Sequence, residues 1–540
     1  MTRGLYLVLY AAVCFGAGRV ALGAEPVALG AGRVALIDAV EKSDKPAVRA
    51  LLNDKSTDVN AVRPDGSTAL QWAVHRDDLE TVEALLRAKA DVRIANRYGI
   101  GPISLAAENG NAAILEKLMN AGANPNTAIA GGETVLMTAA RNGRAAAVKT
   151  LLVHGAKVNA HDERGQTALM WAADRNNADA IRMLVEFGGD IRARTNTPRT
   201  AARTTVFASP PPTSFTPLLF AVRAGELEAV KALLEAGANI NDTLSDGESA
   251  LIVAVANAHW ELADWMLDRG ADPNLAGAGW NALHQAIRER RPNVSFGTPG
   301  PIPTGKVDSI DVVKKMIAKG ADVNARMTRN GMKDGQRTRL LRLGATPFFL
   351  AAKVTDVEAM RVLLSAGANP LTPNAEGTTP LMVAAGLKIW NPGEDGGSLI
   401  GQEGEVLEAV KMCVELGNPV NATNADGETA LHGAAYRGAN QVVEYLVEHG
   451  AKLDAKDVRG WTPLLIANGI DYTDFYKQQA ATADLLRRLM KARGISTEGQ
   501  VSDGTECHDC LQTHGDQSRA ALERDRKMEA EFAAKPSQKP

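Results

Sequence analysis

The chain contains 540 residues and is almost electrically neutral, with 60 Lys and Arg against 63 Asp and Glu and a formal net charge of −3. A nucleic-acid-binding domain usually carries a basic excess, so this balance argues against a nucleic-acid partner. Hydrophobic residues make up 45% of the chain, but aromatic residues only 4%. Ala and Leu carry most of the apolar content, which favours thin helical layers over one bulky core.

The first 24 residues are typical of an export signal. Arg3 supplies a positive charge, the apolar run "LYLVLYAAVCF" follows, and the small-residue stretch "GAGRVALGAEP" comes next. The run is too short to span a bilayer as a helix. We therefore expect a signal peptide at 1–24 and an exported, periplasmic or secreted protein with no transmembrane segment after its removal. An uncleaved anchor or a misassigned start is the alternative.

From about Leu36 onward, one pattern recurs with a base period of 33 residues. Its copies include "STALQWAV", "QTALMWAA", "FTPLLFAV", "TALHGAA" and "WTPLLIAN", and most carry Thr at the first frame position. Self-similarity at a fixed period of this length predicts a repeat array and not several globular domains.

Each unit predicts two short helices. In "GETALHGAAYRGANQVVEYLVEHG", Thr429 can cap the first helix and Gly438 can end it. The small apolar face of the first helix includes Leu431, and the second helix carries a stripe that includes Val443 and Leu446. One unit cannot bury its own stripe, so the units must stack.

This pattern resembles the ankyrin repeat, "G-x-TPLHLAA-x-x-G-x-x-x-x-V-x-x-LL-x-x-GA-x-x-NA", over about residues 35–495. The resemblance implies an all-α solenoid of about twelve stacked helix-turn-helix units with β-hairpin turns. It also implies a protein partner bound on the concave surface of hairpins and first helices. The expected repeats lie at about 35–62, 63–95, 96–128, 129–160, 161–194, 214–242, 243–275, 276–326, 344–371, 372–422, 423–455 and 456–495.

Two histidines, His432 and His284, occupy the histidine position of the family pattern. The resemblance assigns them to support of the turn between repeats. Other units carry Gln71, Met137 or Leu219 at the same position, and none of these is a base. We therefore expect no catalytic role for either histidine.

Four insertions interrupt the period, at 195–213, 292–309, 327–343 and 388–404. The third is basic, with Arg329, Lys333, Arg337 and Arg339 against a lone Asp334. Such a loop could dock an acidic partner or an anionic surface. A solvated loop that only keeps an edge soluble is the alternative.

Three aromatic residues, Tyr98, Trp280 and Trp461, stand beside the predicted hairpin turns. Exposed aromatic residues in such places are typical interface anchors, so we expect them to contribute to partner binding. Packing on the neighbouring hairpin is the alternative, because large rings often cover adjacent apolar surface.

The tail at 496–540 leaves the repeat pattern, and we expect it to be disordered, although "SRAALERDRKMEAEFAAK" could form a short charged helix with little to pack on it. It holds one cluster with ligand chemistry, Cys507, Cys510 and His514. A c-type haem site is disfavoured because Leu511 stands where C-x-x-C-H needs histidine. A zinc site lacks its second ligand pair, so we predict no metal and no cofactor. A redox pair remains an alternative.

Sequence motifs of hydrolases, metalloproteases, P-loop proteins and dinucleotide-binding proteins are absent from the chain. We therefore expect a non-enzymatic scaffold for an unknown protein partner. The alternative is a redox- or metal-linked protein that uses the Cys507/Cys510 tail.

Overall fold

The computed structural model describes residues 34–196, 214–291, 301–303, 305–330, 340–388, 403–471, 476–500 and 527–532. The predicted signal peptide at 1–24, the middle of each predicted insertion and most of the tail lie outside these residues. The chain divides into two compact units, Met1–Thr127 (unit 1) and Ala128–Pro540 (unit 2).

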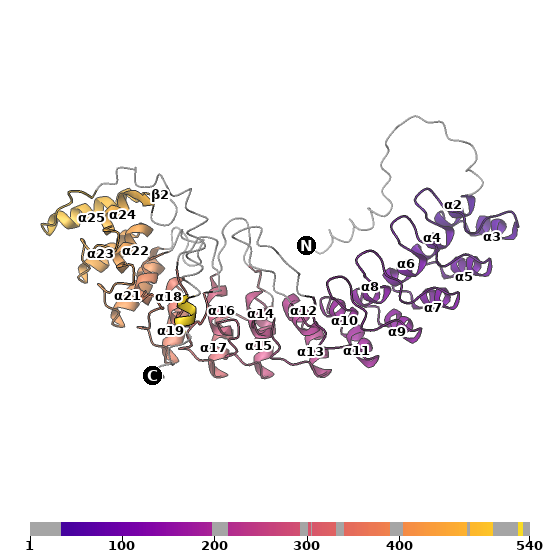
Figure 1. Ribbon diagram of the computed structural model, residues 1–540, viewed down its shortest axis with the longest axis horizontal. Coiled ribbons are helices and arrows are strands. Elements are labelled where there is room, and N and C mark those ends of the chain that lie inside the picture. The colour runs from indigo at the N-terminus through magenta and orange to yellow at the C-terminus, as the bar shows by residue number, and fades with distance from the viewer. Residues whose placement is uncertain are drawn as a thin grey trace, which may run out of the picture. The chain divides into compact units, whose positions relative to one another are not determined.

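Unit 1 contains three helix pairs within the described residues. The pairs are α2 (Ala35–Glu41) with α3 (Lys45–Asn53), α4 (Ala69–His75) with α5 (Leu79–Arg87), and α6 (Pro102–Asn109) with α7 (Ala112–Asn120). Within this unit, α2 packs on α4 and α4 on α6, and the second helices α3, α5 and α7 pack on one another in the same order (Figure 1).

Unit 2 contains nine further pairs within its described residues, stacked in the same way with first helices in one layer and second helices in another (Figure 1). They are α8 (Val135–Arg141) with α9 (Ala145–Val153), α10 (Ala168–Ala173) with α11 (Ala178–Glu186), α12 (Pro217–Ala224) with α13 (Leu227–Glu235), α14 (Ala250–Ala256) with α15 (Trp260–Asp268), α16 (Ala282–Arg290) with α17 (Ser309–Ala318), α18 (Pro347–Lys353) with α19 (Val357–Ser365), α20 (Pro380–Ala384) with α21 (Glu403–Glu415), α22 (Ala430–Arg437) with α23 (Asn440–Glu448), and α24 (Pro463–Gly469) with α25 (Ala480–Ala492). The predicted all-α repeat fold is confirmed.

Side-chain caps begin most first helices. The side chain accepts a hydrogen bond from the backbone N–H three residues on, which satisfies a donor that the helix leaves free. The residues that cap in this way include Thr68, Thr134, Thr216, Ser249, Asn281, Thr346 and Thr379. At the other end of α22, Gly438 adopts a left-handed φ of 80°, a conformation that glycine tolerates without strain.

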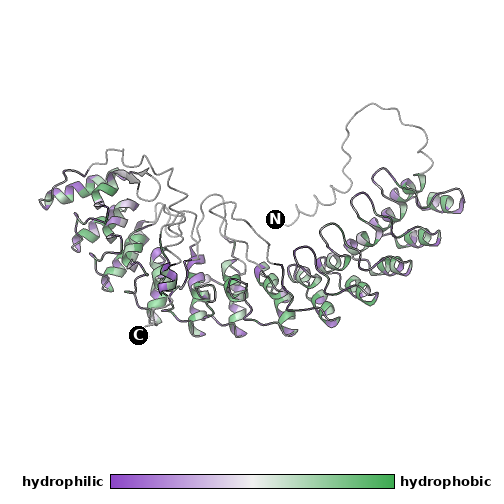
Figure 2. Cartoon of the chain, in the orientation of Figure 1, coloured by the Kyte–Doolittle hydropathy of each residue, from purple (hydrophilic) through white to green (hydrophobic). Residues whose placement is uncertain are grey.

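The core lies between the two helix layers and between neighbouring pairs. Leu431 and Ala434 of α22 and Val443 and Leu446 of α23 are all 0% exposed. In Figure 2, green hydrophobic residues run along the helices of each pair, while purple hydrophilic residues occupy other positions on the helices. Small alanines on the first helices allow close stacking, which explains the low aromatic content.

Hydrogen bonds join successive hairpin turns. In unit 2, Ala425 N–H donates to the Glu376 carbonyl at 2.8 Å, and Val458 N–H donates to the Asp426 carbonyl at 2.9 Å. Within one hairpin, Asp457 Oδ1 accepts from the N–H groups of Arg459 and Trp461, both at 2.9 Å. These bonds satisfy the backbone groups that the turns leave unpaired.

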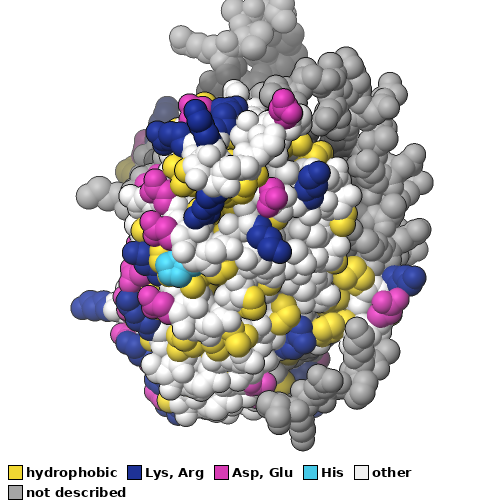
Figure 3. All heavy atoms as spheres, turned by 90° about the vertical axis from the view of Figure 1, so that its left-hand side faces the viewer, with side chains coloured by type: hydrophobic (Ala, Val, Ile, Leu, Met, Phe, Trp, Pro, Cys, Tyr) yellow, Lys and Arg dark blue, Asp and Glu magenta, His cyan; other side chains and the backbone are white. Residues whose placement is uncertain are grey.

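The last helix, α25, has the two-sided character expected of a terminal repeat. Leu486 and Met490 are 0% exposed against the preceding pair, whereas Asp484, Arg487 and Arg488 are exposed. Figure 3 views this end of the molecule, where charged side chains gather along one edge and hydrophobic side chains are scattered among polar ones.

One local feature departs from the sequence-based expectation. A two-stranded antiparallel ribbon, β1 (Ile470–Asp471) and β2 (Tyr476–Lys477), separates α24 from α25, where a plain helix pair was expected. Residues 527–532 form a short helix within 518–535, the part of the tail whose sequence allows one. Within the described ranges, no helix is both long and apolar enough to cross a membrane.

Candidate protein-interaction surface

The first helices of unit 2 present two positions on one face, four and seven residues after the capping residue. Residues three apart on a helix project from the same side. In α10 these positions hold Trp171 and Asp174, in α8 the second is Arg141, and in α12 they are Phe220 and Arg223. We call these five residues the first-helix row.

The row is continuous across three helices. The guanidinium of Arg141 lies 5.2 Å from the ring centroid of Trp171 on the next first helix. The guanidinium of Arg223 lies 4.8 Å from the centroid of Phe220, and its Nη2 lies 3.0 Å from Asp174 Oδ1. Cations over aromatic faces are attracted by the ring quadrupole, so the arginines are held in place before any partner arrives.

The outer side of the row is accessible. The side chains of Arg141, Asp174 and Arg223 are 27%, 31% and 41% exposed, and Trp171 is half-buried. Phe220 is buried beneath Arg223 and supports it. The row therefore offers cationic and aromatic surface to a partner, in a geometry fixed by packing.

Further along unit 2, the same face of the first helices is closed in α18 and α22. Lys353 of α18 and Tyr436 of α22 occupy the seventh position after their caps and are each 1% exposed. In α16, Gln285 at the fourth position is buried, whereas Arg288 at the seventh position is 30% exposed and lies 2.8 Å from Glu289 Oε1. The segment from α8 to α12 is therefore the part of this face where an aromatic ring, that of Trp171, is accessible.

A buried charge network lies on the hairpins beyond α18. Lys388 Nζ lies 2.7 Å from Asp426 Oδ2 and 3.2 Å from Glu376 Oε2, and Arg459 Nη2 lies 3.2 Å from Glu428 Oε1. Burial by itself would lower the pKa of Lys388, but these carboxylates outweigh burial and raise the pKa above its ordinary value. These ion pairs hold Lys388, the first residue of the fourth predicted insertion, against the hairpin turns.

The family-position histidines support hairpins, as the sequence predicted. His432 Nδ1 accepts from the Thr429 N–H at 3.1 Å, and Nε2 donates to the Trp461 carbonyl at 3.2 Å. His284 is fully buried, with Nε2 at 3.1 Å from the Ala325 carbonyl. Burial lowers the pKa of His284 to about 4, so the ring is neutral at ordinary pH.

Gln71 occupies the same position in unit 1 and makes the same contacts. Its Oε1 accepts from the Thr68 N–H at 2.8 Å, and its Nε2 donates to the carbonyls of Ile94 and Ile100 at 3.1 and 2.8 Å. An amide can therefore replace the imidazole at this position without loss of the hairpin contact.

The three predicted aromatic anchors lie on different hairpins, Tyr98 in unit 1 and Trp280 and Trp461 in unit 2. Tyr98 is 45% exposed, with the Arg97 guanidinium 4.8 Å from its ring centroid. Trp461 is half-buried beneath Arg459, whose guanidinium lies 3.9 Å from its centroid. Trp280 is only 8% exposed, so the expectation that it is an exposed residue was wrong, and its ring packs within the array.

The basic insertion at 327–343 is anchored by apolar residues at both ends. Met327 and Leu343 are 0% exposed, Leu340 is 2% exposed, and Arg342 is also only 2% exposed. Arg329 is exposed, while Lys333, Arg337 and Arg339 lie outside the described residues. The alternative of a wholly solvated loop is therefore wrong for the ends of the insertion, which are part of the packed array.

The cysteine cluster of the tail, Cys507, Cys510 and His514, also lies outside the described residues. Among the residues that the structure describes, no group of three or more His, Cys, Asp or Glu could hold a metal ion. Cys413 of α21 is 0% exposed, and burial raises the pKa of its thiol to about 12.

The sequence analysis expected partner binding on hairpins and first helices, but its candidate residues lie only at hairpin turns and in the third insertion. The residues of the first-helix row were therefore not predicted. A signal was present: Trp171 and Phe220 stand at a repeat position where other units carry Thr138, Val253 or Gly433. The signal is incomplete, because Trp72 of α4 stands at the same position and is buried.

Comparison with known proteins identifies the array. A family model described as "Ankyrin repeats (3 copies)" matches residues 9–96, 36–129, 103–195, 218–295 and 400–476, more than half of the chain. The chain belongs to the ankyrin repeat family. Ankyrin repeats generally mediate protein–protein interaction.

Similar proteins share only part of their length with this chain. The potassium channel AKT1 of rice (Oryza sativa subsp. indica) is 40% identical over 80 residues, 14% of this chain and 9% of the channel. The E3 ubiquitin-protein ligase KEG of Arabidopsis thaliana is 25% identical over 315 residues, 55% of this chain and 18% of the ligase. This chain thus spans less than a quarter of either relative. The human ASB11 ankyrin repeat domain is 22% identical, with a TM-score of 0.37 over 50% of this chain and 100% of that domain.

Proposed function

We propose that this protein is a non-enzymatic scaffold that binds a protein partner along the first-helix row and the hairpins beside it. The observation that carries this proposal is the ordered row in which Arg141 lies over Trp171 and Arg223 pairs with Asp174, on an accessible face. Trp and Arg are the residues most enriched at the energetic centres of protein interfaces.

The chemistry of the row indicates the kind of partner. Each arginine of the row is oriented by a carboxylate, Arg141 by Glu133 at 3.1 Å and Arg223 by Asp174 at 3.0 Å, beside the aromatic surface of Trp171. A partner with an acidic side chain next to an apolar one would complement it, since Arg can pair with a carboxylate while its stem covers apolar surface. Because packing already orders the side chains, little conformational entropy is lost on binding.

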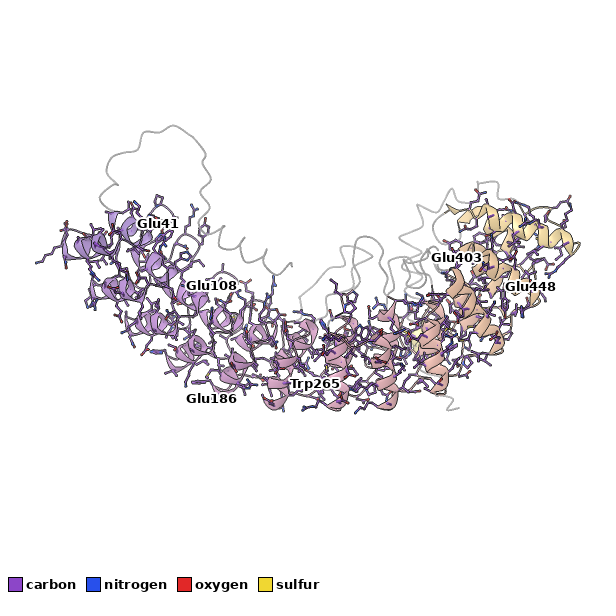
Figure 4. The ribbon with its side chains drawn as sticks, turned by 180° about the vertical axis from the view of Figure 1, so that it is seen from behind. Glu41, Glu108, Glu186, Trp265, Glu403 and Glu448 are labelled. Atoms are coloured by element: carbon purple, nitrogen blue, oxygen red, sulfur yellow. The ribbon has the colours of Figure 1, made fainter. Side chains whose placement is uncertain are left out.

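The test compares two tryptophans in similar surroundings. Trp265 of α15 is half-buried in the second-helix layer, with the Arg269 guanidinium 4.9 Å from its centroid (Figure 4). Trp171→Ala should abolish capture of a partner that the wild-type chain retains, whereas Trp265→Ala should not. Both variants should keep the thermal midpoint of the wild type within a few degrees.

Three outcomes separate the possibilities. Loss of the partner from Trp171→Ala alone supports the proposal. Equal capture by both variants would remove the row from the interface. Loss accompanied by a large fall in the thermal midpoint would show that Trp171 acts through packing; the exposed Arg223→Ala variant then provides the second measurement.

The alternative redox or metal-linked function rests on Cys507 and Cys510. A chain with both cysteines replaced by serine should retain partner capture under the scaffold proposal. Loss of capture in that variant, with a bound metal or a disulfide in the wild type, would favour the alternative.

A further inference from the structure

A short helix from the C-terminal tail lies against the hairpins of unit 2. Residues 527–532, "KMEAEF", form this helix beside the ends of the third predicted insertion. In Figure 1 it is the yellow segment near α18. It is separated by more than 180 residues of sequence from the hairpin that it contacts, so the contact is tertiary and not a product of chain proximity.

Two side chains of the tail helix make the contact. Glu529 Oε1 accepts a hydrogen bond from the backbone N–H of Asn330 at 2.7 Å. The Phe532 ring lies beneath Arg326, whose guanidinium is 5.0 Å from the ring centroid. Residues three apart share one helix face, so Glu529 and Phe532 engage the hairpin together.

The receiving surface is held rigidly by the array. Arg326 Nε donates to the Gly344 carbonyl at 3.0 Å, and its Nη2 donates to the Pro373 carbonyl at 2.8 Å. Asn330 Oδ1 accepts from the Arg342 N–H at 2.9 Å. Gly344 leaves room for the Arg326 guanidinium and for the ring, because a Cβ there would lie 2.7 Å from Arg326 Nη2 and 3.2 Å from Phe532 Cε2.

We propose that Arg326, Asn330 and Gly344 form a binding site for a short helix with Glu and Phe three residues apart, and that the chain's own tail occupies it. The tail then acts as an internal competitor for any partner segment of that pattern. This inference rests on the proposed scaffold function and adds to it a second site, its ligand chemistry and its regulation.

The tail helix is held by few contacts, so a partner segment can displace it. One charge-assisted hydrogen bond and one cation–π contact, both at the surface, hold the helix. A tethered ligand gains an effective concentration on the order of millimolar. If the free segment binds with a dissociation constant of ~0.1 mM, tethering keeps the site occupied about nine-tenths of the time.

The experiment uses a fluorescent peptide of residues 522–540 and the full-length chain. The wild-type chain, whose site is occupied, should bind the peptide weakly. The full-length variant Glu529→Ala/Phe532→Ala, whose site is vacant, should bind it ~tenfold more tightly by anisotropy. The same peptide carrying Phe532→Ala should not bind either chain.

A second arginine that stacks on an aromatic ring, Arg97, serves as the control for the assignment of the site. In the vacant-site background, Arg326→Ala should abolish peptide binding, and Arg97→Ala should not, although Arg97 also stacks on an aromatic ring at a hairpin. Equal peptide affinity of the wild type and the vacant-site variant, or no binding by the vacant-site variant, would overturn the inference. Trp171→Ala should leave peptide binding unchanged, so this result is independent of the test of the first-helix row.

Discussion

At the scale of single residues, His284 and Gln71 show two side chains performing one structural task. Both tie the N-terminus of a first helix to the carbonyls of the following hairpin. The two residues differ because the histidine side chain can take up a proton and the glutamine side chain cannot. Burial lowers the pKa of His284 to about 4, whereas histidine in an unfolded chain titrates near 6.5.

His284 should therefore make stability depend on pH in a defined window. Between pH ~6.5 and ~4 the unfolded state binds the proton and the folded state does not, so the contribution is complete above this window and is lost as pH falls through it. His284→Gln should keep the hairpin contact and remove this loss. Urea unfolding at pH 7.5 and 5 measures the effect. His284→Ala is the control: it should cost about 1–3 kcal/mol at pH 7.5 and less at pH 5, where the wild type has itself lost part of its stability.

Glu248 should have the opposite pH dependence. Burial, and then the nearby charge of Asp246, raise its pKa to about 7, although Arg288 partly offsets them. The folded state holds the proton more tightly than the unfolded state, so this stabilisation is present below pH ~4.5 and is lost as pH rises through 7. Glu248→Gln should raise the urea midpoint relative to wild type at pH 8 and give no advantage at pH 4.5. A lower midpoint at pH 8 would contradict the assignment.

At the scale of elements, the buried charge network shows how an inserted segment is attached to a repeat. The side chains of Lys388, Glu376 and Glu428 are 9%, 7% and 3% exposed. Lys388→Met should leave the buried carboxylates without their ammonium partner and cost roughly 3–5 kcal/mol of unfolding free energy. Lys411→Met, at an exposed position on α21, should change stability by less than about 0.5 kcal/mol in the same assay. Similar losses in both would exclude a special role for the network.

The elements differ in how far their own sequence defines them. Helix starts at Thr68, Thr346 and Thr379 could be predicted because a cap is a local signal. Burial of the ends of the basic insertion could not, because Met327 and Leu343 pack on neighbours that no local pattern identifies.

The exposure of the first-helix row could not be predicted from the sequence either. Trp171 is half-buried and Lys353 is 1% exposed, although α10 and α18 both place them on the first-helix face. What distinguishes them is whether other parts of the chain cover that face, which is a tertiary property that the sequence of one repeat does not define. Residue type alone would have predicted the reverse order of burial.

At the scale of the whole molecule, each helix pair gains its stability from the pairs beside it. Leu431 is 0% exposed within α22, and Leu431→Ala should cost roughly 2–5 kcal/mol. Because repeats contact mainly their neighbours, hydrogen exchange should accelerate in peptides covering 430–492 and remain unchanged in peptides covering 135–186. Uniform acceleration across unit 2 would instead show that the unit unfolds as one cooperative body.

The buried thiol of Cys413 can report how often helix α21 opens, because an alkylating reagent reaches it only when the helix is released. Its thiol is 0% exposed and its pKa is about 12, so an alkylating reagent meets almost no thiolate while α21 stays packed. In a chain whose other cysteines are replaced by serine, the labelling rate therefore counts how often this one helix is released. That rate should stay at the level of local opening in the wild type and rise in Lys388→Met. Labelling as fast as that of an unfolded peptide would show that the helix is not held.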